Sequence, residues 1–168
     1  MRNLIVAAAL VWSTAALAQS SAWQVQRSDD GSVVASLGME YPSSQGVTIL
    51  GLLNVGFGAR DRCQPEIGVA LLKGRHYGSA VGRISPPRTE PISLVINGVE
   101  IPTPAPFLVK YDNGLEVLFP GDPRILEALL GGSTAVVQIV PGTPQLTFPI
   151  AGGGEAIAEA DRECAAAE

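Results

Sequence analysis

Very few residues in this sequence could act as nucleophiles or metal ligands. The 168-residue chain has two cysteines, Cys63 and Cys164, and a single histidine, His76. A catalytic serine needs a base beside it, usually histidine, and the chain has no G-x-S-x-G motif. We interpret His76, in the stretch GRHYGS, as a partly exposed loop residue. Transition-metal sites need several ligands at recurring spacing, so the sequence predicts no catalytic triad, no metal site and no cofactor.

Paired carboxylates are the catalytic arrangement that the sequence leaves open. A glycoside hydrolase needs only two carboxyl groups at the right separation, and that separation is a property of the fold. Nothing in the sequence singles out one pair, so a small hydrolase stays an alternative function. The loop candidates are Asp61, Glu66, Glu90 and Asp122.

Two polar stretches could instead contact a partner. The stretch GFGARDRC places Arg60 and Arg62 in one loop beside a cysteine, and the fork geometry of arginine suits a carboxylate or a phosphate. The other interpretation of this stretch is a solvated charge cluster in which the arginines pair with Asp61. A second possible contact cluster is formed by Arg75, His76 and Tyr77.

Three consecutive glycines, Gly152 to Gly154, stand between a predicted strand and a predicted helix. A phosphate-binding loop needs a lysine and a serine or threonine after its glycines, whereas Glu155 and Ala156 follow here. The Glu155 carboxylate supplies the negative charge that a helix N-terminus attracts, and it would repel a phosphate. We therefore interpret the glycines as a flexible corner.

The N-terminus has the pattern of a secretory signal peptide. Arg2 precedes a nine-residue apolar run from Leu4 to Trp12, and Ala16-Leu17-Ala18 offers a cleavage site. The run is too short to span a bilayer. The sequence thus predicts a signal peptide at residues 1–18, a single β-rich exported domain at residues 19–168, and no membrane span after cleavage. We expect the domain in the periplasm or outside the cell.

Export places Cys63 and Cys164 in an oxidising compartment, where an even number of cysteines indicates pairing. Their bridge would close a loop of roughly 100 residues, worth up to ~4.7 kcal/mol in the chain-entropy model. The alternative is a reactive thiol.

Without Arg2, ten basic and sixteen acidic residues give a net charge of about −6. No basic cluster follows a phosphate backbone, so we expect no nucleic-acid partner.

The 13 prolines and 19 glycines separate short apolar runs, which is typical of an all-β domain. The run VTILGLLNV predicts a strand buried on both faces, and Asn97-Gly98 is the strongest hairpin signal. Asp122 as N-cap, Pro123 and the following leucine-rich face predict a short internal helix, and residues 155–166 a terminal one. We expect an antiparallel β-sandwich or a partly open barrel with these two helices. Residues 75–91 are expected to form an irregular link.

Four stretches resemble the invasion-associated locus B family of small exported proteins from Gram-negative bacteria. They are AWQV at residues 22–25, ISLVINGVEIP at 92–102, ILEALLGGSTAVVQI at 125–139 and FPIAGGGEAIAEADREC at 148–164. The resemblance implies an exported, non-enzymatic β-rich protein linked to the cell envelope or to host contact. It carries over no catalytic residue.

Together these observations favour an exported protein of the cell envelope that works by binding. The expected partner is another envelope protein, a secretion-system component or a host protein. Two alternatives stay open: a small hydrolase that acts on envelope polymers through paired carboxylates, and a carrier that holds a small apolar ligand between its sheets.

Overall fold

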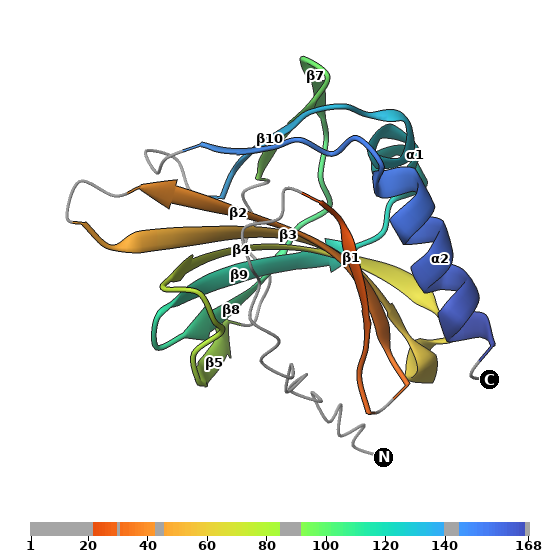
Figure 1. Ribbon diagram of the computed structural model, residues 1–168, viewed down its shortest axis with the longest axis horizontal. Coiled ribbons are helices and arrows are strands. Elements are labelled where there is room, and N and C mark those ends of the chain that lie inside the picture. The colour runs from red at the N-terminus through yellow and green to blue at the C-terminus, as the bar shows by residue number, and fades with distance from the viewer. Residues whose placement is uncertain (1–21, 30, 43–45, 85–91, 140–144, 167–168) are drawn as a thin grey trace.

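The computed structural model of the chain describes residues 22–29, 31–42, 46–84, 92–139 and 145–166. The predicted signal peptide and Glu90 lie outside the described residues. Two antiparallel sheets face each other in a β-sandwich, and two helices stand at one end of it (Figure 1). The predicted fold class, including one short internal helix and one C-terminal helix, is confirmed.

The larger sheet has seven strands and the smaller has four. In spatial order the larger sheet contains β1 (Gln24–Arg27), β2 (Val33–Pro42), β3 (Thr48–Gly58), β4 (Gln64–Lys73), β9 (Gly114–Pro120), β8 (Phe107–Tyr111) and β5 (Ala80–Ile84). The smaller sheet contains β11 (Leu146–Phe148), β10 (Ala135–Gln138), β6 (Ser93–Ile96) and β7 (Val99–Ile101). The helical segments are η1 (Ala59–Asp61), α1 (Pro123–Gly131) and α2 (Gly153–Ala165).

The local signals in the sequence fix two of these elements. Asn97 and Gly98 have φ angles of 50° and 80°, as a two-residue turn with both central residues left-handed requires, and they join β6 to β7. At the start of α1, the Asp122 Oδ1 atom accepts a hydrogen bond from the Arg124 backbone N–H at 2.8 Å. Pro123 occupies the first helical turn. The predicted hairpin and the predicted helix cap are both confirmed.

The seven-stranded sheet has an inner face, which packs against the smaller sheet and the helices, and an outer face on the opposite side. Successive side chains of a strand point to opposite faces. On β3, Leu53 and Val55 face inward and Leu50 and Leu52 face outward, and all four are buried. The prediction that this strand is buried on both faces is confirmed. The largest inner side chains, Phe119 and Phe148 among them, fill the space between the sheets.

The glycine run at residues 152–154 is a packing corner. Gly152 has a φ of 84°, which suits glycine, and it precedes the first residue of α2. A Cβ atom at Gly153 would lie 2.9 Å from the indole ring of Trp23, so this position has room only for glycine. The Trp23 indole N–H also donates to the Ile150 carbonyl at 3.2 Å. The residue that precedes β1 and the first residue of α2 are therefore in close contact here.

The expectation of an irregular link over residues 75–91 is wrong for Ala80–Ile84, which form β5. This strand pairs antiparallel with β8 at the edge of the larger sheet, with a register shift between Ala80 and Gly82. Ala80, Val81 and Gly82 are exposed, so the segment lacks the apolar alternation that marks a strand in sequence. Backbone pairing with β8 therefore holds β5 in its extended conformation.

Candidate functional site

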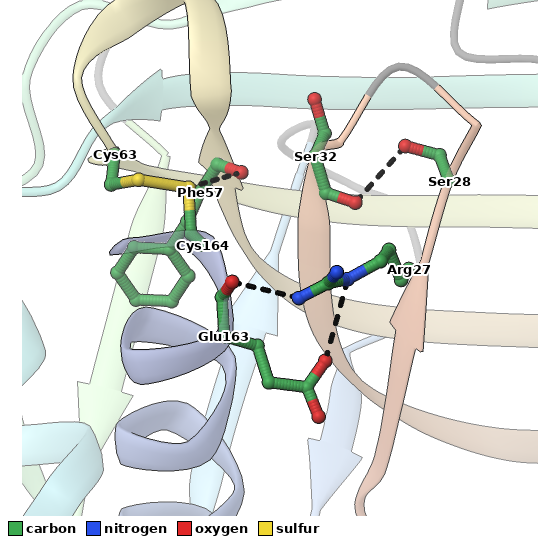
Figure 2. Close-up of polar contacts among 7 residues, drawn as sticks. All are labelled: Arg27, Ser28, Ser32, Phe57, Cys63, Glu163 and Cys164. Atoms are coloured by element: carbon green, nitrogen blue, oxygen red, sulfur yellow. Dashed lines mark hydrogen bonds and ion pairs between the residues drawn. A yellow bond between two sulfur atoms is a disulfide. The ribbon is translucent and has the colours of Figure 1, made fainter. Parts of the chain in front are cut away.

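The two cysteines are bonded to each other at the end of the sandwich where β3 meets β4. The Cys63–Cys164 disulfide joins Cα atoms 5.9 Å apart and fastens α2 to the start of β4 (Figure 2). The structural disulfide is confirmed, and no free thiol is left to react. Disulfides persist in oxidising compartments, so the bridge is typical of a protein outside the cytoplasm.

A polar contact beside the disulfide ties the first strand to the same helix. The Arg27 Nη2 atom donates to the Glu163 carbonyl oxygen at 2.8 Å, and Arg27 Nε lies 3.7 Å from the Glu163 carboxylate (Figure 2). The neighbouring β1–β2 turn is closed by a bond from the Ser28 hydroxyl to the Ser32 carbonyl at 3.0 Å. The disulfide therefore lies at a corner that is fixed on several sides.

We call Arg60, Arg62 and Cys63 the arginine corner. Both arginines are exposed and flank the end of η1. Arg62 and Cys63 have φ angles of 55° and 53°, a left-handed conformation that non-glycine residues adopt rarely and at a cost of about 1–3 kcal/mol each. No ion pair joins either arginine to Asp61 or to another acidic group of the described residues, and both interpretations of this stretch stay predictions.

The second predicted contact cluster lies at the opposite end of β4. Arg75 and His76 are exposed, and the Arg75 guanidinium pairs with the Glu40 carboxylate at 2.9 Å. Ten residues of β4 separate this cluster from the arginine corner, roughly 30 Å along an extended strand. The fold therefore does not bring the two clusters together. Tyr77 turns away from its two neighbours and onto the outer face of the sheet.

On that outer face Tyr77 reaches a buried carboxyl group that the sequence did not single out. Glu116 of β9 is only 7% exposed. Its Oε1 atom accepts a hydrogen bond from the Tyr77 hydroxyl at 3.0 Å, and its Oε2 atom accepts one from the Tyr111 hydroxyl at 2.9 Å. The Asn54 amide donates to the Tyr77 hydroxyl at 3.0 Å and to Glu116 Oε1 at 3.4 Å. We call these four residues the Glu116 cluster.

The environment of the Glu116 cluster favours neutral side chains. Burial raises the pKa of Glu116, the hydrogen bonds from Tyr111, Tyr77 and Asn54 act in the opposite direction, and the Glu66 carboxylate adds to the rise. Burial and the neighbouring Glu116 also raise the pKa of both tyrosines. All three donors are neutral groups, so the carboxylate has no cationic hydrogen-bond partner among the described residues.

Sequence reasoning missed Glu116 because alternation in LEVLF assigns it to the solvent face. The register explains the difference. Glu116 lies opposite Ala70 of β4 and beside Gly68, where a Cβ atom would stand 2.9 Å from Glu116 Oε1. Small residues on β4 thus make room for the carboxyl group, and Tyr77 and Tyr111 cover it. The only signal in the sequence was a glycine inside an otherwise apolar strand, which often marks a close approach.

The described carboxylates that were candidates for catalysis are placed differently. Asp61 and Glu66 are exposed. Both oxygens of Asp122 bind its neighbour Arg124, at 3.0 Å to Nε and 2.7 Å to Nη2, which lowers the pKa of Asp122 to about 2. Within the described ranges, no three His, Cys, Asp or Glu side chains form a group that could hold a metal ion.

The protein is an antiparallel β-sandwich whose C-terminal helix is fastened to the larger sheet by a disulfide. Neither of its described helices is long and apolar enough to cross a membrane. No protein-family model, curated protein or solved structure matches the chain. The resemblance to the invasion-associated locus B family stays a prediction.

Proposed function

We propose that this protein is an exported, non-enzymatic binding protein of the cell envelope, and that its arginine corner contacts an acidic group of a partner protein. The observation that carries the proposal is the conformation of the corner. Two consecutive non-glycine residues, Arg62 and Cys63, are held in the left-handed region next to a disulfide. Such backbone persists only where the surrounding structure imposes it, and it concentrates at functional sites.

The charges at the corner support an acidic partner. Arg60 and Arg62 are exposed and have no ion pair among the described residues, although the chain as a whole carries a net charge of −5. A guanidinium on a fixed backbone loses less entropy on binding than one on a flexible loop, and it can bind a carboxylate through two parallel hydrogen bonds. The partner that fits is an envelope, secretion-system or host protein with exposed Asp or Glu side chains.

The two alternative functions have less support. A hydrolase that uses Glu116 as its acid would need that carboxyl group open to substrate, yet both of its oxygens already accept hydrogen bonds from tyrosine hydroxyls. A carrier of apolar ligands needs room between the sheets, and this is where Phe119, Phe148 and Leu53 pack with almost no exposed surface.

The decisive experiment compares capture of partner proteins from envelope extracts by the wild type and two charge-matched variants. Arg60→Gln/Arg62→Gln removes two positive charges from the corner. Lys73→Gln/Lys110→Gln removes two from exposed positions elsewhere on the sheet. We expect the corner variant to bind the captured partner at least about tenfold more weakly, an effect of about 1.4 kcal/mol, and the control variant to bind as the wild type does.

Raising the salt concentration should weaken binding of the wild type and of the control variant, because exposed charge pairs are screened. Equal capture by the two variants would refute the role of the corner. Turnover of cell-wall polysaccharide that disappears in Glu116→Gln would establish the hydrolase alternative instead.

A further inference from the structure

The connection from β4 to β5, residues 74–79, passes over two intervening strands. In the larger sheet β9 and β8 lie between β4 and β5, so the connection must cross the end of the β8–β9 hairpin. Asn113, in the hairpin turn, holds it there. Its side-chain amide donates to the Lys73 and His76 carbonyls at 2.9 and 2.7 Å, and its Oδ1 atom accepts from the Gly78 N–H at 2.9 Å. We call residues 74–79 the strap.

Tyr77 fastens the middle of the strap to the outer face. Its ring lies edge-on to Tyr111, with centroids 5.0 Å apart, and both rings pack against a small apolar cluster. Its hydroxyl binds Glu116 and Asn54. The apolar cluster that the two rings cover consists of Leu50, Leu52, Ala70 and Leu72.

The strap also has backbone contacts at its two ends: the Gly74 N–H donates to the Thr48 carbonyl at 2.8 Å, and the Ser79 carbonyl accepts from the Asp112 N–H at 3.0 Å. The Arg75–Glu40 pair has an exposed guanidinium, and surface ion pairs of this kind contribute little to stability. Tyr77 contributes the apolar contact of the strap and its hydrogen bonds to the outer face, so a change at this attachment alters how firmly the strap is held. Glu116 is the ionisable group at that attachment.

We propose that the strap is a proton-linked cover of the outer face, closed when Glu116 is protonated and released more often when Glu116 is ionised. An ionised carboxylate that is 7% exposed and has only neutral hydrogen-bond donors is poorly solvated. Opening of the strap lets water reach it, so ionisation favours the open state. Protonation removes this cost, and the protonated carboxyl group can still hydrogen-bond to the tyrosines.

The sign of the pH dependence follows from the same geometry. Burial raises the pKa of Glu116 above its ordinary value, so the closed strap is favoured at acidic pH and loses stability as the pH rises through the pKa in the closed state. The titratable groups that act on Glu116 are Tyr77 of the strap, Tyr111 of β8 and Glu66 of β4. Asn54 of β3 is neutral. The strap itself carries exposed Arg75 and His76.

Hydrogen exchange of the backbone amides in residues 74–79, measured on the oxidised protein between pH 5 and pH 8, tests the proposal. Exchange times are scaled to the intrinsic rate at each pH. We expect the opening of the strap to increase at least about threefold over this range in the wild type, while β2 keeps its protection. Glu116→Gln should abolish the pH dependence, because glutamine cannot ionise.

Three further variants separate Glu116 from other causes. His76→Gln should keep the wild-type pH dependence, because Glu116, and not His76, is the ionisable group that Tyr77 contacts. Tyr77→Phe should raise exchange of the strap at every pH. Tyr41→Phe, which removes a hydroxyl bonded to the Thr147 carbonyl at 2.6 Å, should leave the strap unchanged.

Two results would overturn the proposal: pH-independent opening in the wild type, or an unchanged pH dependence in Glu116→Gln. If Glu116→Gln does not fold, His76→Gln decides, because loss of the pH dependence in that variant would assign it to histidine. Equal changes in β2 and in the strap would indicate global unfolding and would also contradict the proposal.

Discussion

The two faces of the seven-stranded sheet bury their side chains by different means. On the inner face Leu53, Val69 and Val117 pack against the smaller sheet and the helices, where apolar contact suffices. On the outer face, the carboxyl group of Glu116 is buried. Hydrogen bonds from two tyrosines and an asparagine offset the cost of removing this group from water. The same strands thus carry an apolar core on one side and, on the other, a small apolar cluster beside a buried, titratable carboxyl group.

The comparison shows where this fold is stable and where it can respond to its surroundings. Close-packed apolar groups are insensitive to pH, and the disulfide fixes α2 onto the inner side. A buried carboxyl group makes stability depend on its ionisation. We therefore expect large, pH-independent losses from changes on the inner side and smaller, pH-dependent changes on the outer side.

The largest effect is expected from removal of the disulfide. Cys63→Ala/Cys164→Ala should lower the free energy of unfolding by about 2–5 kcal/mol, because the unfolded chain regains the freedom of a long loop. Urea unfolding of the wild type and of the double variant measures the loss. A loss below about 1 kcal/mol would mean that the packing of α2 alone holds the inner side together.

The next largest loss of stability is expected at Gly68 of β4, which packs against the Glu116 side chain. A Cβ atom at Gly68 would lie 2.9 Å from Glu116 Oε1 and 3.0 Å from Leu118 Cδ2, so Gly68→Ala should cost roughly 1–3 kcal/mol. Gly82→Ala is the matched control, because a Cβ atom there meets nothing within 4 Å. Thermal unfolding of both variants checks the prediction, and equal melting temperatures would refute the tight packing of the outer face.

Glu116→Gln should change how stability depends on pH. The pKa of Glu116 is raised in the folded state, so its contribution is full below the usual value of 4.5 and is lost as the pH rises through the folded-state pKa. The variant should therefore gain stability relative to the wild type as the pH rises above 4.5 and through the folded-state pKa of Glu116. Urea unfolding at several pH values tests this, and a constant difference would contradict it.

The smallest effect is expected at Asp122, whose contribution to stability is lost when the pH falls and not when it rises. Hydrogen bonds from Arg124 lower its pKa from 3.8 to about 2, so the stability that it gives α1 is full above pH 3.8 and is lost as the pH falls through about 2. The difference in stability between the wild type and Asp122→Ala should shrink over that acidic range, as followed by circular dichroism. A difference that persists at pH 2 would show that the charge of Asp122 is not what caps the helix.

Local features of the sequence predicted most of the fold. A continuous apolar run marked β3, Asn97-Gly98 marked the β6–β7 turn, and Asp122 with Pro123 marked the start of α1, because each of these signals acts through neighbouring residues. The predicted signal peptide and an even number of cysteines were enough to predict the Cys63–Cys164 disulfide. Gly152 forms the expected corner, whereas Gly153 and Gly154 belong to α2, and Trp23 packs against Gly153.

The tertiary structure alone decided how the sites are arranged. The sequence grouped Tyr77 with Arg75 and His76, but the crossing of the strap turns Tyr77 onto a carboxyl group 39 residues away in the chain. Edge strand β5 depends in the same way on a partner strand, since its own residues lack an apolar pattern. By itself the sequence determined the local elements and their covalent bridge. The buried Glu116 cluster required the register of four strands, because burial of a charge depends on groups that are distant in sequence and meet only in the folded chain.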